Sequence, residues 1–174
     1  MSLERLKGYS EKFAKLSLVL IAAIVTIIVC ETICFMWQAL MPGKLHSFFS
    51  TVKLYLPFIT DIDNNALCLY ELGISIFKNL FAFVILTVAR RMFLKFSKTI
   101  SLGSVTSEIK TLALILIADA VALPVMKLVS YNIFTKEVIH SGIFDVSPII
   151  LGALLYYIAL VIQSKSVFKE ETEE

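Results

Sequence analysis

The uncharged run LSLVLIAAIVTIIVC at residues 16–30 decides the fold class of this chain. The apolar stretch continues to Leu40, with Glu31 as its single charged residue. A helix needs roughly 20 apolar residues to cross the ~30 Å hydrocarbon core of a bilayer. Bulky Trp37 stands near the end, where a cleaved signal peptide has small residues. We therefore predict an uncleaved transmembrane helix over 16–40, with Trp37 as an anchor at the membrane interface.

Three further apolar runs of similar length follow, at about 67–89, 111–134 and 146–162. Of the 174 residues, 58% are hydrophobic and only 17% are charged, an apolar share above that of ordinary soluble domains. No repeat and no Ser-, Pro- or Gly-rich linker divides the chain. The sequence predicts an all-α fold, an integral membrane bundle of four transmembrane helices in one domain, 1–174. A net charge of +2 gives no support to a nucleic-acid partner.

The distribution of basic residues predicts the orientation of these helices. Lys and Arg total eleven in the N-terminus, the second connection and the C-terminal tail, against three in the first and third connections. Positive charge accumulates on the cytoplasmic side of membrane proteins. Both termini are therefore predicted to be cytoplasmic, and the chain is predicted to be a multi-pass protein of the bacterial cytoplasmic membrane.

The connections carry their own signals. The apolar outer connection, 41–66, is expected to lie on the membrane surface. The inner connection, 90–110, alternates basic and aromatic residues, which is typical of a helical extension resting on anionic lipid. Its basic residues form a predicted lipid-facing patch: Arg90, Arg91, Lys95 and Lys98. Thr106 or Ser107 is expected to cap the third helix, and Pro148 to open the fourth.

Ionisable side chains within the predicted spans are the candidate functional residues: Glu31, Glu71, Lys78, Asp119 and Lys127. At ~1.5 Å per residue, Lys78 and Asp119 lie about 16 and 12 Å from the cytoplasmic end. By the same measure Glu31 and Lys127 lie at about 22 and 24 Å. Depth therefore predicts the pairs Lys78–Asp119 and Glu31–Lys127. Glu71, at about 27 Å, either joins Lys127 or reaches the outer interface.

Two interpretations of these charges are open. In the first they are structural ion pairs that fix which helix packs against which. In the second they form a proton or ion relay, as intramembrane ionisable chains do in transporters. Pro124 is expected to kink the third helix and to free the carbonyl of Ala120, which suits either interpretation. Gly152, one turn before Tyr156, is expected to let two helices approach closely.

No motif for catalysis or cofactor binding is present in the sequence. Cys30, Cys34 and Cys68 are expected to be buried inert thiols, with a Cys34–Cys68 disulfide as the alternative. His46 and His140 match no metal-site spacing. The chain has no nucleotide loop, H-E-x-x-H or G-x-S-x-G. We therefore predict that the protein is not an enzyme and needs no cofactor and no metal.

Several segments together resemble the DUF2975 family of small bacterial four-helix membrane proteins: 83–96, the link with Ser101 and Ser104, the third apolar run, 148–155 and 168–171. The likeness covers about the second half of the chain. The family's tail usually continues from its acidic residues into a short apolar stretch, and here the sequence stops. The resemblance implies a bacterial inner-membrane protein and supplies no catalytic residue.

These observations favour a non-catalytic membrane protein that works by contact, as an accessory, regulatory or protective subunit. Its expected partners are membrane lipids and either another membrane protein or a second copy of the chain. The alternative is an oligomeric transporter, coupled to protons or ions, that uses Asp119, Lys78 and Glu31.

Overall fold

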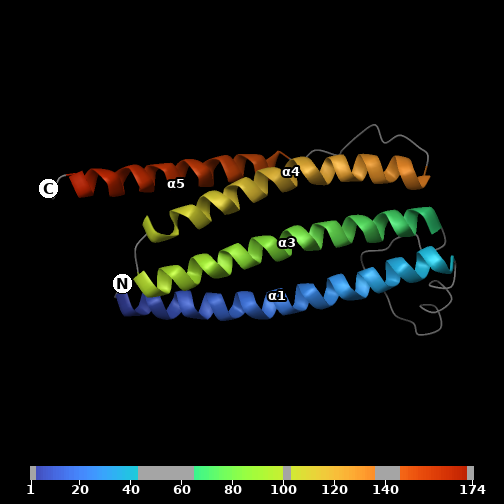
Figure 1. The fold of residues 1–174 in the computed structure, drawn as a ribbon, viewed down its shortest axis with the longest axis horizontal. Helices are drawn as coiled ribbons and strands as arrows, with labels where there is room; N and C mark the ends of the chain where they lie inside the picture. Colours follow the sequence, from blue (N-terminus) through green and yellow to red (C-terminus); the bar gives the residue numbers. More distant parts are fainter. Residues whose placement is uncertain (1–2, 43–64, 100–102, 136–145, 172–174) are drawn as a thin grey trace. The chain divides into compact units, whose positions relative to one another are not determined.

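The computed structural model describes residues 3–42, 65–99, 103–135 and 146–171, and the regular structure of these residues is entirely helical. In chain order the helices are α1 Leu3–Leu40, α3 Asn65–Thr99, the short 3-10 helix η1 Gly103–Val105, α4 Thr106–Thr135 and α5 Ser147–Glu171 (Figure 1). Each of the four α-helices is long and apolar enough to cross a membrane. The all-helical prediction and the four candidate spans are confirmed.

The helices are longer than the apolar runs that predicted them. α1 begins at Leu3, so the basic segment before the first apolar run is part of the helix. The predicted helical extension beyond Ala89 is also present, since α3 continues to Thr99. α4 starts at Thr106 and remains helical through the buried Pro124. Pro148 occupies the first turn of α5, where its missing N–H removes no intrahelical hydrogen bond.

The chain forms two compact units. The first consists of Met1–Ala23, Ala82–Ala120 and Asp145–Glu174, and the second of Ile24–Phe81 and Val121–Phe144. α1, α3 and α4 contribute residues to both units, and α5 belongs to the first.

In the first unit, polar and aromatic contacts join neighbouring helices. The hydroxyl of Ser10 on α1 donates to the carbonyl oxygen of Phe93 on α3 at 2.7 Å. The rings of Phe13 and Phe93 stack with centroids 5.4 Å apart. Lys95 on α3 forms an ion pair with Glu108 on α4. These contacts fix the level at which the three helices meet.

The contact between α4 and α5 in the first unit depends on a glycine. Gly152 is buried, and a Cβ atom placed there would lie 2.7 Å from Cγ1 of Ile117 and 2.8 Å from the carbonyl oxygen of Ala113. The two backbones therefore approach so closely that only a hydrogen atom fits between them. This confirms the close helix approach predicted at Gly152.

The second unit has a small core of its own. Cys68 and Leu72 on α3 are fully buried, and Cys34, Phe35 and Trp37 of α1 pack against them. All three cysteines are free thiols. Cys68 is buried as predicted, but Cys30 is exposed. The prediction of burial was wrong for Cys30, because apolar composition around a residue does not say which side of its helix faces a neighbour.

Most of the apolar surface of the helices faces outward. Within the most apolar stretch of each candidate span, only 6% to 17% of the residues are buried. Exposed large hydrophobic side chains occur on all four α-helices, among them Val19, Leu80, Leu114 and Tyr157. Such a surface is compatible with lipid or with neighbouring transmembrane helices. His46, His140 and almost all of the outer connection lie outside the described residues.

Candidate functional site

Three of the five predicted intramembrane charges line one hollow in the second unit. The hollow has a volume of about 310 Å³. We call it the intramembrane hollow. Its lining residues are Tyr70, Glu71, Ile74, Ser75 and Lys78 from α3 and Lys127 from α4. The structure therefore brings Glu71, Lys78 and Lys127 together.

Helical periodicity explains how α3 presents these groups. Glu71, Ser75 and Lys78 are separated by four and three residues, so they lie on one face of the helix. On α4, Lys127 is one turn away from Tyr131. The ring of Tyr131 meets that of Tyr70 edge-to-face, with centroids 5.3 Å apart. This aromatic contact holds α3 and α4 together beside the hollow.

The charged side chains of the hollow differ in their exposure. Lys78 is exposed, whereas Glu71 and Lys127 are partly buried. Lysine near the centre of a bilayer costs about 2.5–3.5 kcal/mol on insertion scales. An exposed lysine in the middle of a predicted span therefore needs either a counter-charge or a polar neighbour that covers it.

Glu31 does not line the hollow and is only 2% exposed. Its Oε1 accepts a hydrogen bond from the hydroxyl of Ser75 at 2.5 Å, and its Oε2 accepts one from the amide Nδ2 of Asn79 at 2.9 Å. Both donors are on α3, one turn apart. Each carboxylate oxygen thus has a donor, which compensates for the loss of water around a buried charge.

The predicted Glu31–Lys127 pair stays a prediction, and the partners that the structure gives to the Glu31 carboxylate are Ser75 and Asn79. The depth estimate gave the height of each residue and not its direction around the helix axis. Ser75 and Asn79, which the sequence analysis did not select, could have been found from their spacing. Together with Glu71 they form a polar stripe at every fourth position within the apolar run 67–89.

The Lys78–Asp119 pair remains a prediction. Lys78 belongs to the second unit and Asp119 to the first. Pro124, on α4 of the second unit, lies one turn before Lys127 and is buried.

The four basic residues of the predicted lipid-facing patch have different surroundings. Lys95 is engaged by Glu108, which in turn accepts a hydrogen bond from the Ser107 hydroxyl at 2.8 Å. Arg91 is exposed. Arg90 and Lys98 instead line a second pocket, in the first unit, that also includes residues of α1. The four basic residues are thus not equivalent.

The chemistry of the intramembrane hollow is that of charge recognition. It carries two ammonium groups and one carboxylate, and Ser75 connects it to the second carboxylate, Glu31. The lining itself therefore carries a formal charge of +1. Searches against family models, curated proteins and solved structures found no match to this chain. The DUF2975 resemblance therefore stays a prediction.

Proposed function

We propose that this protein is a non-catalytic membrane subunit of the accessory, regulatory or protective kind, which acts by contacts within the bilayer. The intramembrane hollow is the contact site, and it receives a side chain with a carboxylate or another strong acceptor from a partner's transmembrane helix. The observation that carries this proposal is the exposed Lys78 in the middle of a predicted span.

The energetics of the hollow favour a partner over lipid. Hydrocarbon chains cannot pair with the ammonium of Lys78, so leaving it open to lipid costs several kcal/mol unless the side chain bends toward the interface. A partner carboxylate removes this cost. Glu71 shares the hollow with two lysines, and the oxygens of Glu31 already accept hydrogen bonds from Ser75 and Asn79, so a partner carboxylate can compete for Lys78.

The cellular setting is part of the same proposal. The excess of Lys and Arg in three segments supports cytoplasmic termini. The DUF2975 resemblance supports a location in the bacterial cytoplasmic membrane. With this topology Lys78 lies near mid-bilayer, which is the position where an uncovered charge is most costly.

Affinity purification of the intact protein from its native membranes tests the proposal. We expect a stoichiometric membrane partner to be retained by the unmodified protein and lost with Lys78→Met. Lys12→Met is the matched control, since Lys12 is an exposed lysine of α1 that belongs to the first unit and does not line the hollow. Equal retention of the partner by Lys78→Met and by the control would contradict the proposal.

One observation favours the transporter alternative, namely that three ionisable groups share one open hollow. A transporter coupled to a proton gradient would use Asp119, Lys78 and Glu31. A counterflow assay in liposomes separates the two functions. Flux driven by a pH gradient and abolished by Asp119→Asn would replace the contact function with transport.

A further inference from the structure

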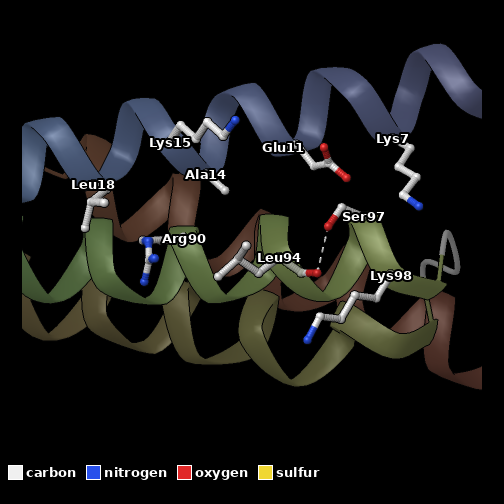
Figure 2. Close-up of a pocket in the computed structure, with 9 residues that line it drawn as sticks. All are labelled: Lys7, Glu11, Ala14, Lys15, Leu18, Arg90, Leu94, Ser97 and Lys98. Atoms are coloured by element: carbon white, nitrogen blue, oxygen red, sulfur yellow. Dashed lines mark hydrogen bonds between the residues drawn. The ribbon is translucent and has the colours of Figure 1, made fainter.

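The second pocket lies between α1 and α3 in the first unit and has a volume of about 460 Å³. Figure 2 shows its lining in full. The residues from α1 are Lys7, Glu11, Ala14, Lys15 and Leu18. Those from α3 are Arg90, Leu94, Ser97 and Lys98. On each helix the members recur at spacings of three and four residues, so each set occupies one helix face.

The pocket combines a strong positive charge with an apolar wall. Four of its side chains are cationic and one, Glu11, is anionic. Its apolar side chains are Ala14, Leu18 and Leu94. Figure 2 shows Lys7 and Glu11 reaching from α1 toward α3, with Arg90 and Leu94 on the facing helix. A ligand that fits this pocket must be anionic at one part and apolar at another.

Arg90 supplies an observation independent of the net charge. Its Nε atom is buried and has no hydrogen-bond partner among the described residues. A buried donor without an acceptor is destabilising, so such groups are normally satisfied by protein, water or ligand. The planar guanidinium offers its donors in a geometry that matches phosphate oxygens. The orphaned Nε therefore points to a bound oxyanion.

The position of the pocket along the helices selects the kind of anion. Lys15 is the last residue before the first predicted span, and Arg90 is the first residue after the second. Leu18 lies one turn further toward the membrane than Lys15. The contacts of Ser10 and Phe13 with Phe93 hold α1 and α3 together at this level. The charges are thus expected at headgroup height, with an apolar exit along Leu18.

We propose that this pocket is a binding site for the phosphate of an anionic phospholipid. Arg90 is the principal donor, and the ammonium groups of Lys7, Lys15 and Lys98 surround the headgroup. The acyl chains leave the pocket past Leu18. This site differs from a general attraction of basic residues to an anionic surface, because it requires α1 as well as α3 and does not use Arg91 or Lys95.

Native mass spectrometry of the full chain, released from nanodiscs containing phosphatidylglycerol and phosphatidylcholine, tests this site. We expect one phosphatidylglycerol to be retained by the unmodified protein in preference to phosphatidylcholine. Arg90→Gln should weaken this retention at least about tenfold, as removal of charge-assisted hydrogen bonds does. Arg91→Gln, which removes an equal charge from the next and exposed residue, should leave retention unchanged.

Competition distinguishes the two sources of a phosphate group. Displacement of phosphatidylglycerol by millimolar inorganic phosphate would show that the site takes soluble phosphate and would overturn the lipid assignment. Equal losses with Arg90→Gln and Arg91→Gln would show unspecific attraction and would overturn the site itself. If Arg90→Gln does not fold, Lys15→Gln carries the test, because Lys15 is exposed and its loss should also weaken retention selectively.

Discussion

A methyl group added at Gly152 tests the close contact between α4 and α5. In Gly152→Ala the new Cβ would lie 2.8 Å from the carbonyl oxygen of Ala113. Ordinary C–H···O contacts have carbon-oxygen distances of about 3.3–3.6 Å, so α4 and α5 must move apart by some tenths of an ångström. Overpacking of this kind costs about 1–3 kcal/mol. This cost exceeds or cancels the ~1 kcal/mol by which alanine is more favourable than glycine in a helix.

Gly73→Ala provides the matched control on α3. A Cβ at Gly73 would meet only Cε2 of Phe35, at 3.8 Å, which is an ordinary van der Waals contact. Both variants gain similar helix propensity, so the difference between them isolates the overpacking. We expect Gly73→Ala to be more stable than Gly152→Ala by about 1–3 kcal/mol in reversible unfolding in detergent micelles. Equal stabilities, or a more stable Gly152→Ala, would refute the close approach of α4 and α5.

Three further predictions follow from the charges and the topology. Asn79→Ala should lower the free energy of unfolding by about 1–3 kcal/mol, because one oxygen of buried Glu31 loses its donor, whereas Thr32→Ala, on the exposed side of α1, should be near neutral. Lys78→Met and Asp119→Leu should each cost roughly 3–5 kcal/mol if the two are paired, and the double variant should recover part of that loss. If the losses of unfolding free energy in the two single variants add up in the double variant, the pair is excluded. Impermeant thiol reagents should label cysteines placed in the α1–α3 connection of intact cells but not cysteines placed at either end of the chain, and labelling of the C-terminal end would reverse the assigned topology.

The sequence predicts the helices well because a bilayer imposes a simple requirement on length and polarity. The run from Leu16 to Leu40 had to be helical in lipid, where every backbone polar group needs an internal partner. The same requirement says nothing about the segment before it. In the structure that segment is helical from Leu3, and its Phe13 stacks on Phe93 of another helix.

The site was predicted only in part, for a geometrical reason. Counting residues from the membrane edge placed Glu31 and Lys127 at one height, yet the partners of Glu31 are Ser75 and Asn79. Height along a helix follows from sequence, whereas the direction of a side chain around the axis depends on which helices are neighbours. Glu71, Lys78 and Lys127 share a hollow because α3 and α4 meet through Tyr70 and Tyr131, and no sequence pattern specified that contact.

Photo-crosslinking in living cells tests the central claim most directly. Tyr70 lines the intramembrane hollow without carrying its charge, so a benzoyl-phenylalanine there samples the proposed partner helix. The same probe at Tyr157, an exposed residue of α5, samples the surface of the first unit. We predict one discrete protein adduct at position 70 that disappears when Lys78→Met is added, and none at position 157. Protein adducts equal at both positions, or no protein adduct at position 70, would contradict the account.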